Sequence, residues 1–212
     1  MESIAIGAKD YENSLQLDIN DHCCQPFFGR MTAASYLAMG FLYARHGGQM
    51  NKPRYPITQA IRFLRAMQVN FDAFSYTYAD RGGARQAALE LHIPEYRVVK
   101  TLVMETEALS PLLVLMHGDQ AVSTRKLARV IGAKKVLPVQ PEKALTCTGY
   151  QVGGISPFGT RQNMPVYVQT TILELKKIYI NGGKRGFMVA VDPDVLLKTL
   201  SAIPVSVAAF SQ

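Results

Sequence analysis

The sequence predicts a mixed α+β domain: a mainly antiparallel, barrel-like sheet surrounded by short helices. Short segments rich in β-branched and aromatic residues recur along the chain, and turn residues separate them. Capped helical segments are few and short, and they do not alternate with the strands as a parallel sheet requires. The 212 residues suit one domain with an appendage, and 48% hydrophobic residues are enough for a sizeable core.

The first regular elements follow Thr58, which can cap a helix that runs to about Val69. Residues 70–78 alternate large and small side chains and predict a strand. A Gly-Gly break precedes a short helix over residues 84–92, which stops near Pro94. Residues 96–104 then predict a strand rich in β-branched residues.

The middle of the chain continues the pattern. Residues 111–116 form a second apolar strand, which turns at "HGD". Ser123 caps a helix that Gly132 ends, because glycine readily adopts the left-handed conformation of a helix C-terminus. Residues 134–139 predict a short strand, and a glycine-rich loop follows it over residues 149–159.

The last part predicts strands over residues 164–169 and 177–180, and "NGG" (residues 181–183) is predicted to turn the second into a hairpin with 186–191. Asp192 and Pro193 begin a helix over Asp194–Leu200, since proline suits the first helical position. Residues 203–208 end the chain as a strand.

Residues 1–49 differ from the remainder because they lack a clear hydrophobic period. A Gly-Gly pair closes this segment, and Met50 opens a polar, proline-bearing stretch that is typical of a protein start. We therefore expect residues 1–49 to be an N-terminal extension outside the core and residues 50–212 to be the working domain. The alternative is a small helical addition around Met31–Ala44.

The charge balance indicates a polyanionic partner. The net charge is +7 and the isoelectric point is about 9.4, which favours nucleic acid, although a basic enzyme without such a partner fits too. The three cysteines form no disulfide framework, so we expect a cytoplasmic protein. The four histidines are scattered, and neither a metal nor a cofactor is expected. No segment has the ~20 apolar residues of a membrane span.

The loop "GYQVGGISPFG" raises the question of a serine nucleophile. A nucleophile elbow needs a glycine two residues after the serine, where Phe158 stands, and Pro157 has no N–H to stabilise an oxyanion. Phosphate-loop and dinucleotide fingerprints are absent as well. Two interpretations remain: the N–H groups of Gly153 and Gly154 face a carbonyl or oxyanion, or the loop is a tight bend.

Two further features carry positive charge. Strand alternation places Lys100 on one face with Val98 and Leu102, so its side chain either extends to solvent or lines a pocket. Lys184 and Arg185 follow the glycines of "NGGKRG", where they can grip phosphate or occupy a solvated hairpin tip.

Taken in order, "VVKTLV", "TGYQVGGISPFG" and "IYINGGKRGFMVAV" resemble the YbaK/EbsC family of aminoacyl-tRNA deacylases, which is related to the editing domain of bacterial prolyl-tRNA synthetases. The resemblance runs from about Thr58 to the C-terminus. It implies a mixed α/β barrel and a catalytic role for Lys100. The substrate-binding residues that it implies are Tyr76, Thr101, Gly153, Gly154, Ser156, Pro157, Asn181, Gly182 and Gly183. Some relatives have serine in place of Asn181, which leaves the amino-acid preference open.

The predicted function is therefore proofreading in trans. The resemblance implies cleavage of the ester of a mischarged aminoacyl-tRNA, with Cys-tRNA(Pro) or a similar small species as substrate. The enzyme is a hydrolase, or a lyase if the substrate thiol cyclises. Its expected partners are the tRNA acceptor end and prolyl-tRNA synthetase, not a membrane or DNA. The alternatives are a non-catalytic tRNA- or synthetase-binding module and an enzyme for another small acyl ester.

Overall fold

A computed structural model describes residues 55–209. The expectations for residues 1–49, including the helix considered at Met31–Ala44, lie outside this range. No helix among the described residues is long and apolar enough to cross a membrane.

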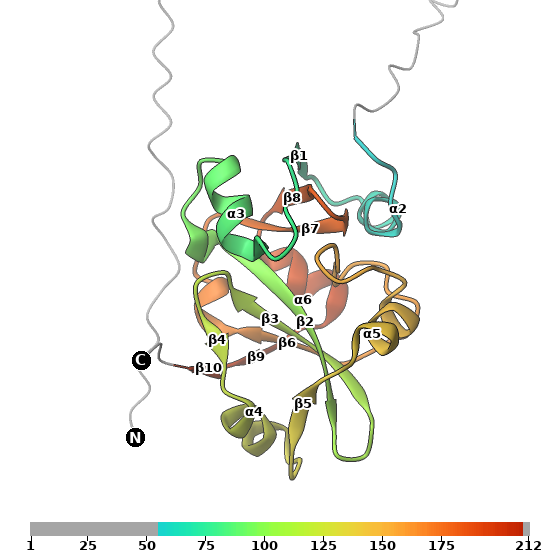
Figure 1. The fold of residues 1–212 in the computed structure, drawn as a ribbon, viewed down its shortest axis with the longest axis vertical. Coiled ribbons are helices and arrows are strands. Elements are labelled where there is room, and N and C mark those ends of the chain that lie inside the picture. Colours follow the sequence, from blue (N-terminus) through green and yellow to red (C-terminus); the bar gives the residue numbers. More distant parts are fainter. Residues whose placement is uncertain (1–54, 210–212) are drawn as a thin grey trace, which may run out of the picture. The chain divides into compact units, whose positions relative to one another are not determined.

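Helices and strands alternate irregularly along the described chain (Figure 1). The helices are α2 (Gln59–Ala66), α3 (Gly83–Glu90), α4 (Thr124–Ile131), α5 (Pro141–Thr148) and α6 (Asp194–Leu200), with 3-10 turns η1 (Glu95–Arg97) and η2 (Thr170–Ile172). The strands are β1 (Asp72–Ser75), β2 (Val98–Thr106), β3 (Pro111–His117), β4 (Ala121–Val122), β5 (Val136–Pro138), β6 (Val166–Gln169), β7 (Ile178–Lys184), β8 (Phe187–Val191), β9 (Ile203–Val205) and β10 (Ala208–Ala209).

Eight strands form one mixed sheet in the order β1-β8-β7-β2-β3-β6-β9, with β5 paired to β2. Parallel pairs join β2 to β7, β3 to β6 and β6 to β9, and the other pairs of this sheet are antiparallel. Figure 1 shows α2 and α3 near β1, β7 and β8, whereas α4 lies beside β5 at the other end. The predicted fold class, a mixed and mainly antiparallel sheet with short helices around it, is confirmed.

Strand β3 is buried on both faces, which explains its unbroken apolar sequence. Leu113 and Leu115 belong to the larger core, whereas Leu112, Val114 and Met116 belong to a second core under α4. Successive side chains of a strand point to opposite faces, so one strand supplies both cores. The centre of the sheet is thereby fixed from two sides.

Helix α2 begins as the sequence predicts. The Thr58 hydroxyl accepts a hydrogen bond from the Ile61 N–H at 3.2 Å, and it also donates to the carbonyl of Gly182. Ile61 and Leu64 are fully buried in the larger core. One side chain therefore caps the helix and attaches it to strand β7.

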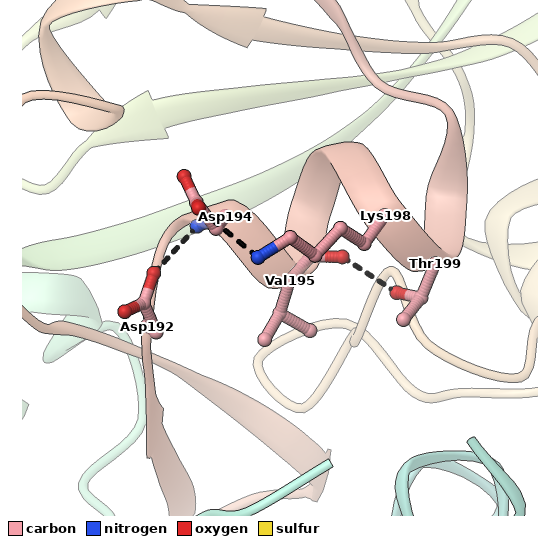
Figure 2. A network of polar contacts seen from close by, with 5 residues as sticks. All are labelled: Asp192, Asp194, Val195, Lys198 and Thr199. Carbon is pink, nitrogen blue, oxygen red and sulfur yellow. Dashed lines mark hydrogen bonds and ion pairs between the residues drawn. The ribbon is translucent and has the colours of Figure 1, made fainter. Parts of the chain in front are cut away.

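Helix α6 has its predicted bounds and a polar network at its surface (Figure 2). A carboxylate oxygen of Asp192 accepts from the Asp194 N–H at 2.8 Å, which satisfies a donor of the first turn. Asp194 pairs with Lys198 at 3.1 Å, and the Thr199 hydroxyl donates to the Val195 carbonyl at 2.7 Å. The observed start of the helix agrees with the role predicted for Asp192 and Pro193.

The turn of the β7–β8 hairpin differs from the prediction. Asn181, Gly182 and Gly183 remain within β7, and a bulge lies between Asn181 and Lys184. Lys184 pairs with Phe187, so Arg185 and Gly186 form the turn instead. The prediction of a turn at residues 181–183 was wrong, because glycines inside a strand often mark a bulge.

Three short elements were not predicted. Helix α5 begins at Pro141 and ends at Gly149, whose φ of +79° is left-handed. Both residues carry ordinary helix signals, a proline at the first turn and a glycine at the C-terminus. Strands β4 and β10 have two residues each and pair with one another, which splits the predicted strand over residues 203–208.

Candidate active site

Along one edge, the central residues of strand β2 are not paired with another strand. It pairs with β7 only at Val98 and Val99, and with β5 only from Met104 to Thr106. Strand β3 occupies the opposite edge throughout, from Val99 to Glu105. Neither β5 nor β7 therefore pairs with residues 100–103, and a cavity of about 510 Å³ opens at this interruption of the sheet.

The cavity brings together segments that are far apart in the sequence. Its lining is mostly apolar and comes from β2, α3, the end of β5, α5, the glycine loop and the β7–β8 hairpin. Lys100 and Thr101 point to opposite faces of β2, yet both line the cavity because it opens at the strand edge. Of the predicted site residues, those that line it are Tyr76, Lys100, Thr101, Gly153 and Asn181.

Lys100 supplies a cation to the cavity. Its Nζ donates a hydrogen bond to the backbone carbonyl of Gln120 at 2.6 Å. Partial burial lowers the pKa of the ammonium, and the carboxylates of Glu95 and Asp119 act in the opposite direction. The side chain lines a pocket and does not simply extend into solvent, which decides between the two interpretations that the sequence left open.

Three neutral polar groups accompany the lysine. Burial raises the pKa of the Tyr76 phenol, with a smaller contribution from Tyr78, so the hydroxyl stays protonated and can donate. The Thr101 hydroxyl is buried and has no hydrogen-bond partner among the described residues. Asn181 adds a side-chain amide from β7. These groups can bind a polar substrate within a mostly apolar cavity.

The glycine loop approaches the β7–β8 hairpin. A Cβ atom at Gly154 would lie 2.8 Å from the backbone carbon of Lys184 and the backbone nitrogen of Arg185, so only glycine fits. The N–H of Gly154 closes a turn by donating to the Gln151 carbonyl at 2.9 Å. Of the two donors that the sequence suggested, Gly154 is therefore occupied, whereas Gly153, with φ of +90°, lines the cavity.

The other predicted residues of the two glycine segments stand behind the cavity wall. Ser156 is fully buried, and its Oγ accepts a hydrogen bond from the Phe158 N–H at 3.4 Å. Pro157, Gly182 and Gly183 do not line the cavity either. Direct contact of these residues and Gly154 with substrate stays a prediction. Their positions favour a supporting role for the cavity wall.

The cavity lining also includes residues that sequence reasoning did not assign to a site. The Arg185 guanidinium carbon lies 5.1 Å from the centre of the Tyr78 ring, and its Nε donates to the Val152 carbonyl at 2.9 Å. Asp80 and Arg81 also contribute to the lining. The sequence signal for this group was Arg185 in "NGGKRG". Tyr78 ends the predicted strand, and Asp80 and Arg81 follow that strand without a recognisable motif.

The side chains of the cavity lining can bind a substrate and polarise one of its carbonyl groups. The lining includes neither histidine nor cysteine, and its one carboxylate is Asp80. Cys147 is buried in the larger core. No group of three or more histidine, cysteine, aspartate or glutamate side chains in residues 55–209 is arranged to hold a metal ion. The cavity thus offers a cation and hydrogen-bond donors without an activated nucleophile.

A sequence model of the aminoacyl-tRNA editing domain matches residues 81–199, which include every residue of the cavity lining except Tyr76, Tyr78 and Asp80. This chain belongs to the aminoacyl-tRNA editing domain family. The family resemblance predicted from "VVKTLV" and the two glycine segments is thereby confirmed, and members of the family edit aminoacyl-tRNA.

Relatives of the editing domain occur as separate proteins and within larger enzymes. EbsC of Enterococcus faecalis, named as a proposed Cys-tRNA(Pro)/Cys-tRNA(Cys) deacylase, is 29% identical over 141 residues, which cover 66% of this chain and 86% of EbsC. A proline–tRNA ligase of Thermodesulfovibrio yellowstonii is 30% identical over 91 residues, which cover 43% of this chain and 16% of the ligase.

The crystal structure of a proposed trans-editing enzyme for prolyl-tRNA synthetase has the same fold. The TM-score is 0.65 at 22% identity, and the match covers 74% of this chain and all of that one (100%). The likeness shows that the two proteins share a fold.

The close approach of Gly154 to the hairpin gives a testable expectation. Gly154→Ala places a methyl group against the backbone of Lys184 and Arg185, which cannot yield as a side chain can. We expect a loss of about 1–3 kcal/mol in the free energy of unfolding, measured by urea denaturation. Gly132→Ala is the control for a glycine with open space around it; it is strained by its own φ alone. An unchanged stability for Gly154→Ala would contradict the packing described.

Proposed function

We propose that this editing domain is a trans-acting deacylase that cleaves the ester of a mischarged aminoacyl-tRNA, with Cys-tRNA(Pro) or a similarly small species as substrate. The observation that carries the proposal is the cavity at the interrupted edge of β2. It combines Lys100 with neutral donors and apolar walls, and it lacks a nucleophile. The names of EbsC and of the trans-editing enzyme support the same substrate class.

A site without a nucleophile suits this reaction. An aminoacyl ester is already activated, so the enzyme gains rate by placing an attacking group against the carbonyl. Donors that point at the developing oxyanion then lower the barrier further. In this proposal Lys100 holds either the phosphate of the terminal adenosine or the substrate carbonyl. The N–H of Gly153 is the candidate oxyanion donor of the glycine loop.

The cavity walls suggest how substrates are selected. Val103, Ala144 and Ile155 are apolar and lie around the same opening as Lys100. Discrimination by one methylene group is worth only about 1–3 kcal/mol. Exclusion of larger amino acids by size is therefore a sufficient first filter, and it favours a small residue such as cysteine.

The attacking group is either a water molecule or the substrate itself. The cysteine thiol can attack its own ester carbonyl: the new C–S bond closes a thiolactone, the bond to the ribose oxygen breaks, and the tRNA leaves with its hydroxyl protonated. The enzyme would then be a lyase and not a hydrolase. The enzyme need only fold the aminoacyl group and stabilise the oxyanion. Intramolecular attack gains from a high effective molarity. This route therefore does not require a nucleophilic side chain in the cavity.

The proposal extends to partners and location. The net charge of +7 gives sequence-independent attraction to the tRNA acceptor end, and the relationship to proline–tRNA ligases makes prolyl-tRNA synthetase the candidate protein partner. These activities belong to translation in the cytoplasm. We assign the activity to residues 50–212.

A binding module without catalysis, or an enzyme for another small acyl ester, would each fail a deacylation assay with mischarged tRNA.

Lys100 provides the first test. Lys100→Ala removes the lysine ammonium from the cavity lining, and we expect deacylation to fall by on the order of 100-fold or more. The melting temperature should change little, because a partly exposed lysine contributes little to stability. Lys198→Ala, in the exposed pair with Asp194, is the matched control and should keep the parent rate. Wild-type turnover by Lys100→Ala would remove this residue from the mechanism.

The thiol provides the second test. Cys-tRNA(Pro) and tRNA(Pro) carrying 2-aminobutyrate have nearly the same size, but only the first has a thiol. Under substrate-assisted attack we expect single-turnover cleavage of the cysteinyl ester to be faster by roughly tenfold or more.

Equal rates for the two esters would point to a positioned water molecule instead. The natural substrate would then be alanine or another small residue. Identification of the product distinguishes the routes independently, because cyclisation yields a thiolactone and hydrolysis yields the free amino acid.

A further inference from the structure

The interrupted edge of β2 exposes backbone groups as well as side chains. N–H and C=O groups of alternate residues in a strand point to the same edge. The carbonyl of Val98 accepts from the Gly118 N–H on the β3 side, and the carbonyl of Val103 accepts from the Val139 N–H on the β5 side. Thr101 lies two residues before Val103, so its backbone N–H and C=O point to the same edge of β2 as those of Val103. This edge is the one that is interrupted between β7 and β5.

Neither of these Thr101 groups has a strand partner on that side. Pairing with β7 stops at Val99, and pairing with β5 begins at Met104. The cavity lining confirms the location, since it contains Thr101 itself, Val139 from the β5 end and Asn181 from β7. Buried backbone donors and acceptors are nearly always paired, so this edge is suited to a ligand that completes it.

The side chain of Thr101 gives an independent indication. The residue is 8% exposed, and its Oγ1 is buried without any hydrogen-bond partner in the described part of the chain. A buried hydroxyl without a hydrogen-bond partner is destabilising unless a ligand or water binds it. Thr101 therefore combines a backbone N–H and C=O that have no strand partner on that side with a buried hydroxyl that has no hydrogen-bond partner among the described residues.

We infer that the aminoacyl group of the substrate docks on this edge as a one-residue strand opposite Thr101. The inference rests on the proposed deacylase function and names the part of the substrate that β2 recognises. The ligand class is an α-amino acid with a free α-ammonium group, linked through its carbonyl.

The chemistry of an α-aminoacyl ester matches the edge. Opposite residues of an antiparallel pair exchange two hydrogen bonds, one in each direction. The α-ammonium donates to the Thr101 carbonyl, and the ester carbonyl accepts from the Thr101 N–H. The second bond polarises the carbonyl that is attacked, so recognition and activation use the same contact. Extended peptides bind exposed sheet edges in the same way.

The arrangement also places the substrate side chain. Opposite residues in a sheet project their side chains to the same face, so the substrate side chain lies beside the Thr101 hydroxyl and near Val103, which both line the cavity. A hydroxyl next to a thiol forms a hydrogen bond that the ethyl group of 2-aminobutyrate cannot form. In this arrangement Thr101 contacts the main chain of the amino acid through its backbone and the side chain of the amino acid through its hydroxyl.

The test measures binding, so that it does not depend on catalysis. Acceptor-stem minihelices are linked at their 3′ end through an amide to cysteine, to 2-aminobutyrate or to 3-mercaptopropionate, which is cysteine without its α-amine. With the full chain we expect loss of the amine to weaken binding roughly 10- to 100-fold, as for a hydrogen bond to a charged group. Equal affinities for the cysteine and mercaptopropionate analogues would overturn the inference.

Variants of Thr101 test the hydroxyl separately. Thr101→Val keeps the shape and the backbone edge, so it should weaken binding of the cysteine analogue severalfold and leave that of the 2-aminobutyrate analogue unchanged. Thr101→Ser should restore the difference. Thr106→Val, on the same strand but outside the cavity lining, is the control.

An equal effect of Thr101→Val on both analogues would contradict the contact with the substrate side chain. Failure of the proposed function has a different signature, because the wild-type chain would then bind the analogues without cleaving the corresponding esters. The two failures are therefore distinguishable.

Discussion

The separation of β5 and β7 along one edge of β2 is the constraint on which the site depends. A continuous sheet would pair every backbone group of residues 100–103 and leave no opening. Here the opposite edge of β2 is paired to β3 over its whole central length, and both faces of β3 are buried. The strand is therefore held rigidly from one side, while its other side stays available to a ligand.

Several contacts keep the opening in shape. The Thr58 hydroxyl joins α2 to the bulge of β7 through the Gly182 carbonyl. Arg185, at the turn of the hairpin, holds the glycine loop by its hydrogen bond to Val152, and Gly154 lets the two backbones approach. The glycine loop therefore approaches the hairpin backbone, and the buried Ser156 lies within the loop.

Local signals in the sequence were sufficient for most elements. The caps at Thr58 and Ser123 and the start at Asp192 each predicted a helix boundary that the structure has. The placement of Lys100 in a pocket followed from the resemblance, whereas alternation alone left it ambiguous. The interruption of the sheet could not be predicted, because pairing between β2, β5 and β7 is a long-range property that no local pattern encodes. The bulge at Asn181 was mistaken for a turn for the same reason.

In the proposed complex, the aminoacyl end of tRNA binds the edge of β2 at residues 100–103. Backbone amide NMR of the full chain, titrated with an amide-linked cysteinyl minihelix, tests it directly. We expect the largest shifts at the amides of Thr101, Val103, Gly153 and Asn181. Large shifts confined to the hollow beside α5, at Glu142, Leu145 and Gln151, with β2 unchanged, would contradict it.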